Sequence, residues 1–361
     1  MRACAACLKR AHLLALLAPW LMRGYRGPRR LPEVLALGDD DLLDAVCGSK
    51  RGVLDRRLEG FDADGASAEA GRKGLATVCP HDLRYPNALR SLRDAPAALY
   101  LRGDPDDIHT MTGQPAVAVV GSRRASPYGL EMARSLSREL SACGVTVISG
   151  LALGIDSAAH EGALDGHGLT VAVMPGGADV QYPRSKAALH ARIGAEGIVL
   201  SEMPPGFRPM TLSFPARNRI MAGLSALTVV VEGARGSGSL ITADLAQVYG
   251  REVAAVPGQA TSALAAGPLD LLRDGAHLVR GAQDVLDLLY GPDVVKVGMQ
   301  SPPRLSPQMS EILDAVDAGA SPEEILAGSM EPAQVLAGLT ELELIGLVRR
   351  DDSGAYLRAV P

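Results

Sequence analysis

The stretch AVAVVGSRRASPYG, from Ala116 to Gly129, decides the fold of this 361-residue chain. Its first five residues, Ala116 to Val120, are small or β-branched and apolar, which predicts a strand buried on both faces. A glycine, a serine and two arginines follow, and a helix is expected from Tyr128 to Ala142. A glycine turn between a buried strand and a helix aims free N–H groups at an incoming anion, so this stretch predicts a phosphate-binding turn.

The same order of strand, turn and helix recurs along the chain. Further strands are expected at Val145–Gly150, Thr170–Gly177, Gly197–Glu202, Ala226–Gly233 and Arg251–Gly258. Strands that alternate with helices predict an α/β fold, an extended Rossmann-like parallel sheet covered on both faces. Ligands of such sheets bind beyond the carboxyl ends of the strands.

Composition divides the chain into four parts. Residues 1–80 alternate leucine-rich helical pieces with Gly and Pro breaks, which predicts a small helical, SAM-like domain. Residues 81–292 carry the sheet, to which the apolar run Ala97–Leu101 adds a strand, and the proline-punctuated residues 293–305 form a linker. Residues 306–361 predict a winged helix, with helices at Ser306–Val316, from the capping box Ser321–Glu324 and at Pro332–Leu344, and a hairpin turning at Asp352–Gly354.

Charge and length limit the kinds of partner. The formal net charge is −5, so a polyanion site must be a local concentration of arginine. Residues 301–361 hold four arginines against ten acidic residues, which favours a protein contact over duplex recognition. The cluster Arg23, Arg26, Arg29 and Arg30 could touch a nucleic-acid backbone or form a solvated loop face. No stretch is long enough to span a membrane.

The cysteines indicate a reducing compartment. Five cysteines are an odd number without framework spacing, which is consistent with the cytoplasm. Cys4 and Cys7 form a CxxC, but no nearby Cys or His pair completes a zinc site, so no metal is expected. The run HLLALLAPWL after Lys9 and Arg10 could pass for a signal peptide, but it lacks an A-x-A cleavage site, which favours a core helix.

Loops rich in phosphate-binding residues follow the predicted strands. They are GSRR (121–124), SGLALGIDSAAH (149–160), MPGGADVQYPRSK (174–186), SEMPPGFRP (201–209), FPARNRIMAGLS (214–225) and VEGARGSGSLIT (231–242). In this order and spacing the six strings resemble the DNA-processing protein A family (DprA, also called Smf), over roughly residues 80–290. The resemblance implies a non-catalytic, cofactor-free protein of natural transformation that dimerises through its Rossmann domain, protects incoming single-stranded DNA and loads RecA on it.

The resemblance also implies which residues contact the single-stranded DNA. We expect the strand to be bound by Gly121, Ser122, Arg123, Arg124, Arg184, Lys186, Phe214, Arg217, Arg219, Ser237 and Ser239. A ring beside arginines, as in FPARNR, suits base stacking. In GPLDLLRDGAHLV the residues Leu269, Leu271 and Leu272 are expected at an isologous dimer interface, although a plain amphipathic helix is an equal possibility.

Several of these residues have an alternative structural role. Arg217 and Arg219 could pair with Asp156 or Glu202 inside the protein, and the ring of Phe214 could belong to the core. Asp156 and His160 have the spacing of an acid–base pair on one helix, but in the family this segment is structural. The serines are expected to be helix caps and phosphate donors, because no G-x-S-x-G elbow surrounds them.

A nucleotide hydrolase is the alternative function. The PGG turn at Pro175–Gly177 is shared with phosphoribohydrolase-like Rossmann enzymes that cleave nucleoside monophosphates. Those enzymes continue with a Gly-Thr pair and a glutamate on the next helix, whereas this chain continues with ADVQYPRSK. VEGARGSGSL also lacks the lysine of a P-loop. The essential acid of such an enzyme is therefore missing from this motif.

Overall fold

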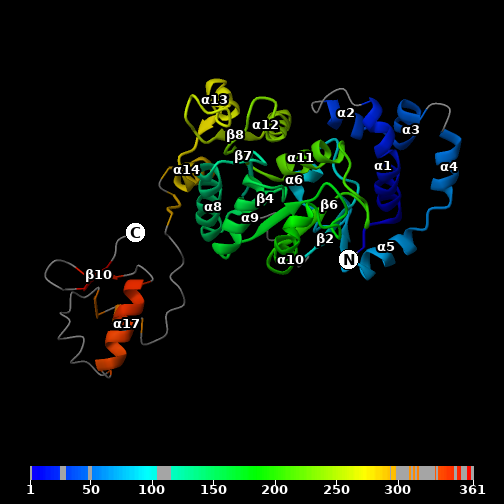
Figure 1. The fold of residues 1–361 in the computed structure, drawn as a ribbon. Coiled ribbons are helices and arrows are strands. Elements are labelled where there is room, and N and C mark those ends of the chain that lie inside the picture. The colour runs from blue at the N-terminus through cyan, green and yellow to red at the C-terminus, as the bar shows by residue number, and fades with distance from the viewer. Residues whose placement is uncertain are drawn as a thin grey trace. The chain divides into compact units, whose positions relative to one another are not determined.

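The computed structural model describes residues 2–24, 30–47, 51–103, 115–292 and 294–297, and, nearer the C-terminus, residues 309, 312–313, 315–316, 330, 332–344, 348–350 and 356–358. The chain divides into two compact units, Met1–Val297 and Gly298–Pro361 (Figure 1). The larger unit holds the predicted sheet, and the smaller one lies within the predicted C-terminal region.

A nine-stranded sheet runs through the larger unit in the order β1-β2-β6-β5-β4-β3-β7-β8-β9. Its strands are β1 (Ala76–Val78), β2 (Leu99–Arg102), β3 (Ala116–Val120), β4 (Thr146–Ser149), β5 (Thr170–Val173), β6 (Ile198–Ser201), β7 (Leu227–Val230), β8 (Glu252–Ala255) and β9 (His277–Leu278). Strands β3 to β9 are parallel, whereas β2 pairs antiparallel with both β1 and β6. The six predicted parallel strands and the strand at 97–101 are confirmed, and β1 and β9 add short edges.

Helices cover both faces of this sheet. They are α6 (Asn87–Arg90), α8 (Pro127–Ala142), α9 (Ile155–Asp165), α10 (Ala187–Glu196), α11 (Ser213–Leu224), α12 (Gly238–Val248), α13 (Ala266–Arg273) and α14 (Ala282–Tyr290). The alternation of β3 shows the two layers: Val117 and Val119 are buried with α8, α9 and α14, and Val120 is buried on the other face with α11 and α12. Burying a valine stabilises the fold by about 1.5–3 kcal/mol, so the continuous apolar run explains the central position of β3.

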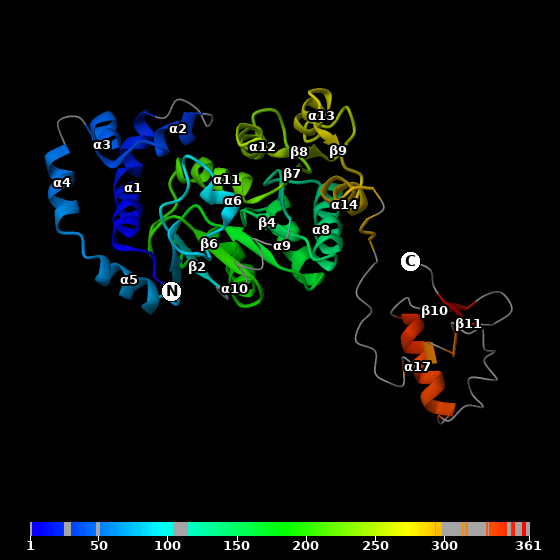
Figure 2. The same cartoon turned by 180° about the vertical axis from the view of Figure 1, so that it is seen from behind.

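The N-terminal helices gather at the β1–β2 edge of the sheet, in blue in Figure 1, and Figure 2 shows them from behind. They are α1 (Ala5–Gly24), α2 (Leu31–Leu35), α3 (Asp39–Cys47), α4 (Arg51–Glu59) and α5 (Ala63–Arg72). Leu13 and Leu17 on α1 are fully buried, so the core helix expected for HLLALLAPWL is confirmed. The strand β1 lies within the predicted helical domain of residues 1–80, yet it belongs to the sheet. Arg26 and Arg29 lie outside the described residues.

No helix among the described residues is both long enough and apolar enough to cross a lipid bilayer.

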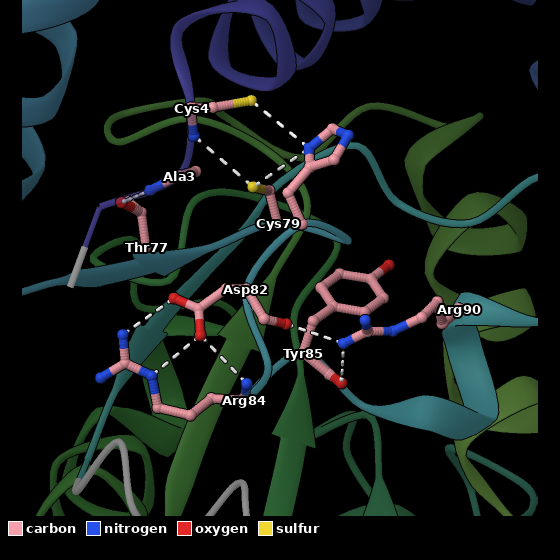
Figure 3. Close-up of polar contacts among 9 residues, drawn as sticks. Ala3, Cys4, Thr77, Cys79, Asp82, Arg84, Tyr85 and Arg90 are labelled. Atoms are coloured by element: carbon pink, nitrogen blue, oxygen red, sulfur yellow. Dashed lines mark hydrogen bonds and ion pairs between the residues drawn. The ribbon is translucent and has the colours of Figure 1, made fainter.

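The start of the chain is fixed to β1 and to the turn that follows it. The backbone N–H of Ala3 donates to Thr77 Oγ1 at 3.0 Å, and that of Cys4 reaches Cys79 Sγ at 3.5 Å (Figure 3). Cys4, Cys7, Cys79 and His81 lie together here, with their ligand atoms within 4.8 Å of one another. The expectation that no second pair accompanies the CxxC is therefore wrong, because the fold brings Cys79 and His81 to it from more than seventy residues away.

The smaller unit contains α17 (Pro332–Leu344) and an antiparallel pair of strands, β10 (Val348–Arg350) and β11 (Tyr356–Arg358). The predicted third helix and both hairpin strands are therefore confirmed. The predicted helix at Ser321–Glu324 and the turn at Asp352–Gly354 lie outside the described residues, as does most of the predicted linker and of the helix at Ser306–Val316.

Candidate nucleic-acid interface

The main candidate site is a cavity of about 560 Å³ at the carboxyl ends of β3 and β7. The chain leaves β3 towards β4 on one side, and returns after β6 to place β7 on the other side of β3. Loops on the two sides diverge at such a reversal of strand order and leave a crevice where ligands bind. Residues 121–124 after β3, the first turn of α12 after β7 and one side of α11 line this crevice.

Gly121 makes the turn after β3 possible. A Cβ at this position would lie 2.6 Å from Ile155 Cγ1 and 2.8 Å from the carbonyl oxygen of Glu232, so only glycine fits between α9 and the end of β7. The backbone N–H of Ser122 donates to the Glu232 carbonyl at 2.7 Å, and Ser122 Oγ accepts from the N–H of Arg124 at 3.1 Å. These contacts hold the turn in place beside the cavity.

The first turn of α12 supplies an anion-binding end of a helix. Ser237 is its N-cap and accepts from the backbone N–H of Ser239, and the two hydroxyls lie 2.9 Å apart. Free N–H groups and the helix dipole at this end favour a negative ligand in the cavity. The capping role expected of Ser237 is confirmed, whereas Ser122 caps no helix, because Ser126 caps α8.

Arginines at the mouth of the cavity are available to a ligand. Arg123, Arg124 and Arg184 are exposed, and among the described residues none of them has a carboxylate within ion-pair distance. Arg123 and Arg124 also border a second cavity of about 560 Å³, which Lys186 lines. The ammonium of Lys186 pairs with Glu161 at 3.1 Å, so part of its charge is already neutralised. Arg184, on the short helix Arg184–Lys186, lines neither cavity.

Two aromatic rings lie beside these arginines. The guanidinium of Arg123 lies over the ring of Phe214, 5.0 Å from its centre, and Tyr182 packs edge-on against Phe214 at 5.7 Å between ring centres. Phe214 is half-buried and borders the main cavity, so it is not a fully enclosed core residue. The sequence interpretation missed Tyr182, which is 39% exposed. Its place in the loop after the PGG turn was the available signal.

Arg217 borders the main cavity but its guanidinium is engaged inside the protein. It donates to the carbonyl oxygens of Gly150 and Val173, the latter at 2.8 Å, and lies 3.6 Å from a carboxylate oxygen of Asp156. The internal ion pair is therefore confirmed, whereas the expected contact of Arg217 with the strand stays a prediction. A Cβ on Gly150 would overlap this guanidinium, so the two residues fill one space.

Arg219 is also turned inward, and its predicted contact with DNA is wrong. Its side chain is 1% exposed, forms an ion pair with Glu202, and donates to the carbonyl oxygen of Asp94 at 2.7 Å. The carboxylate of Asp94 lies 3.7 Å away and accepts from the hydroxyl of Tyr249. A helix turns neighbouring positions by about 100° per residue, and α11 is buried almost all round, so both arginines of FPARNR face the interior.

Asp156 and His160 do not form an acid–base pair. His160 Nδ1 contacts Thr170 Oγ1 at 2.8 Å, and because that hydroxyl donates its proton to the Val147 carbonyl, Nδ1 carries the hydrogen. Burial and the charge of Arg217 lower the pKa of His160 to about 3. Burial raises the pKa of Asp156, and the neighbouring Arg217 opposes that shift. His160 therefore connects α9 to the sheet, and Asp156 connects it to the preceding loop and to α11.

The predicted dimer residues lie on α13. Leu269, Leu271 and Leu272 are all half-buried, and Leu271 packs against the core of the sheet. Asp270, between them, forms an ion pair with Arg235, in which Nε lies 2.6 Å from Oδ2. This arrangement is that of an amphipathic helix on its own domain, and the expected role in a dimer stays a prediction.

Comparisons with known proteins agree with this architecture. The model of the family described as DNA recombination-mediator protein A matches residues 76–290. A DNA processing protein DprA of Mycobacterium tuberculosis is 43% identical over 253 residues, which are 68% of this chain and 65% of that protein. This chain therefore spans about two thirds of the length of that relative.

Solved structures are similar as well. The X-ray structure of DNA processing protein A from Streptococcus pneumoniae has a TM-score of 0.64 and 33% identity, and covers 80% of this chain and 99% of its own. A structure that describes the single-stranded DNA binding mode of DNA processing protein A from Helicobacter pylori has a TM-score of 0.54 and 31% identity, over 60% of this chain and 95% of its own. The resemblance found in the motifs is confirmed, and the chain belongs to the DNA recombination-mediator protein A family.

Proposed function

We propose that this protein binds single-stranded DNA along the carboxyl edge of its sheet, at the cavity between β3 and β7. The observation that carries the proposal is the group of exposed arginines at the cavity mouth, Arg123 and Arg124, for which the described part of the chain provides no carboxylate partner. Phosphates of a strand would replace the water around these guanidiniums and gain bidentate hydrogen bonds.

The aromatic pair fits an unpaired strand better than a duplex. A base can stack on an exposed ring only when it is free of its own partner, and such stacking contributes about 1–3 kcal/mol per base without sequence preference. Phe214 and Tyr182 border a small cavity of about 70 Å³ together with Arg123, so one base could lie on the rings while its phosphate contacts the arginine. Binding of this kind changes no covalent bond.

A finer role belongs to the same proposal, and family membership supports it. The protein would protect incoming single strands in the cytoplasm during natural transformation, act as a dimer through α13, and place RecA on the strand. The helix α17 and the hairpin β10–β11 would form part of a winged helix. Because residues 301–361 hold ten acidic residues against four arginines, that domain would meet a protein rather than DNA.

The test is a titration of the full chain with fluorescent oligo-dT at rising salt concentrations. We expect affinity that falls steeply with salt, and a loss of about 1–3 kcal/mol in Phe214→Ala. Tyr128→Ala is the matched control, because Tyr128 is another exposed ring but lies outside this cluster.

Three results would contradict the proposal. They are salt-independent binding, an unchanged affinity in Phe214→Ala, and release of free base or phosphate from a nucleoside monophosphate. The last result would identify a hydrolase instead. A pull-down against RecA with and without oligo-dT tests the loading role separately, since a protein can bind the strand and still fail to retain RecA.

A further inference from the structure

The cluster Cys4, Cys7, Cys79 and His81 lies outside the DNA interface and has no part in the function proposed above. Cys4 precedes α1 and Cys7 lies in its first turn, whereas Cys79 follows β1 directly and His81 lies in the next turn. A hydrogen bond of 2.8 Å from the N–H of Asp82 to the carbonyl of Cys79 closes that turn. Two pairs with the spacings C-x₂-C and C-x-H therefore face each other across the junction of the helical region and the sheet.

The distances in the cluster fit a single tetrahedral ion. His81 Nδ1 lies 3.5 Å from Cys4 Sγ, 3.5 Å from Cys7 Sγ and 3.8 Å from Cys79 Sγ. A tetrahedral zinc ion, with bonds of about 2.3 Å to sulfur and about 2.0 Å to nitrogen, separates such atoms by about 3.5 Å. All four ligand atoms lie within 4.8 Å of one another, so one ion can reach them all. The four ligands of an iron–sulfur cluster are divided among two or four iron atoms, so those on different irons lie farther apart than ligands of one ion.

A backbone donor is directed at one of the ligand sulfurs. The backbone N–H of Cys4 points at Cys79 Sγ at 3.5 Å. N–H groups directed at ligand sulfurs are the usual outer contacts of thiolate-bound metals. Cys7 and Cys79 are buried, so two of the four ligand atoms are shielded from solvent.

We propose that Cys4, Cys7, Cys79 and His81 bind one structural zinc ion. Four protein ligands leave no open position, so this ion does no chemistry on a substrate. It joins the start of α1 to the end of β1 and closes a loop of some seventy residues, and such closures restrict the unfolded chain. The zinc would hold the N-terminal helices on the β1 edge of the sheet.

The experiment measures zinc in the untagged full chain after gel filtration, by elemental analysis. We expect one equivalent per chain in the unaltered protein and in Cys143→Ser, whose cysteine lies outside the cluster. Cys7→Ser and His81→Ala should bind zinc more than about 100-fold more weakly in competition with a chelator, since even outer contacts of a metal contribute 10- to 100-fold. Equal retention of zinc in these variants would overturn the proposal.

A cobalt measurement needs only the unaltered chain, and a chelator measurement adds the variants that fold. Cobalt(II) added to the chelated, unaltered chain should give the intense visible bands of tetrahedral coordination and a thiolate charge-transfer band. Excess chelator should lower the unfolding temperature of the unaltered chain and of Cys143→Ser, but not that of Cys7→Ser. Octahedral cobalt spectra, or a disulfide between Cys4 and Cys79 in protein purified under reducing conditions, would contradict a zinc site. Oligo-dT affinity is measured alongside, so that failure of the zinc site and failure of DNA binding are told apart.

Discussion

Two pairs of arginines in this protein have opposite environments. Arg123 and Arg124 follow β3, are exposed, and have no carboxylate partner among the described residues. Arg217 and Arg219 lie on α11, are buried, and are paired with Asp156 and Glu202. The guanidinium group is open to a ligand in the first pair and is an internal connection in the second. Which role it takes depends on whether a buried carboxylate already neutralises it.

The largest expected effect is a loss of stability when an arginine of the buried pair, Arg217 and Arg219, is removed. Arg219→Ala leaves Glu202 and Asp94 buried without their cation, so we expect it to lower the free energy of unfolding by about 3–5 kcal/mol. Urea denaturation measures this loss. Arg280→Ala is the matched control, because Arg280 is exposed and pairs with Asp284 on the surface, where such a pair contributes at most about 1 kcal/mol.

Oligo-dT affinity, measured per folded molecule, should be the same in Arg219→Ala and in the unaltered chain. A strong loss of affinity without a loss of stability would reverse the assignment of Arg219 to the interior.

The pH dependence of stability is the second effect. Burial and the charge of Arg217 lower the pKa of His160 from 6.5 to about 3, so the unfolded chain binds a proton in this interval that the folded chain does not. Stability is therefore complete above pH 6.5 and falls as pH decreases towards 3, by about 2 kcal/mol between pH 7 and pH 5.

Urea midpoints of the unaltered chain and of His160→Asn across this interval provide the test. The variant should be less stable but should depend less on pH, with a residual slope because burial also lowers the pKa of His12 and His190. His167→Asn is the control, since His167 is exposed. Equal slopes in the three proteins would contradict the buried neutral imidazole.

Replacing the exposed pair, Arg123 and Arg124, should weaken DNA binding without changing the stability of the fold. Arg123→Ala combined with Arg124→Ala should weaken oligo-dT binding at least about tenfold at low salt, because a hydrogen bond to a charged group contributes about 1.5–3 kcal/mol. The slope of log affinity against log salt should flatten by about 0.7 for each phosphate contact removed. Unchanged urea midpoints are expected, and Arg280→Ala is again the control. An unchanged slope would mean that these arginines do not meet phosphates.

The smallest change in DNA affinity should involve Lys186. This residue is partly exposed, unlike either pair of arginines, and a carboxylate on the surface already pairs with it. Glu161→Gln removes the carboxylate that lies 3.1 Å from its ammonium. The free ammonium should then strengthen oligo-dT binding by less than about 1 kcal/mol and steepen the salt dependence. The double variant Glu161→Gln with Lys186→Gln should lose this gain. Weaker binding in Glu161→Gln alone would place Lys186 outside the path of the strand.

Much of the fold could be predicted from the sequence because its signals are local. The apolar runs that form β3, β4, β5, β7 and β8 lead into glycine-containing turns. These runs and turns together predict a parallel sheet and the edge at which ligands of such sheets bind. The short edges β1 and β9 lack such a signal, because three and two residues carry too little periodicity.

The orientation of single side chains on a fully buried helix could not be predicted. FPARNR has polar residues at positions that all face the interior of α11, so no polar stripe indicates which side meets solvent. The pairing of Cys4 and Cys7 with Cys79 and His81 depends on a contact between β1 and the start of the chain, which spacing along the sequence does not reveal. The place of Tyr182 after the PGG turn was its one signal in the sequence, and its contact with Phe214 depends on the fold.

The shared space of Gly150 and Arg217 has a consequence for variation at these two positions. A methyl group at residue 150 is compatible with the crevice only when the side chain at residue 217 is shortened, and a shortened side chain at 217 leaves a void that a larger residue at 150 can fill. Libraries that randomise either codon alone should thus recover little folded protein, whereas joint randomisation should recover compensated pairs. The two positions are 67 apart in the sequence, yet substitutions at one should be tolerated only together with substitutions at the other.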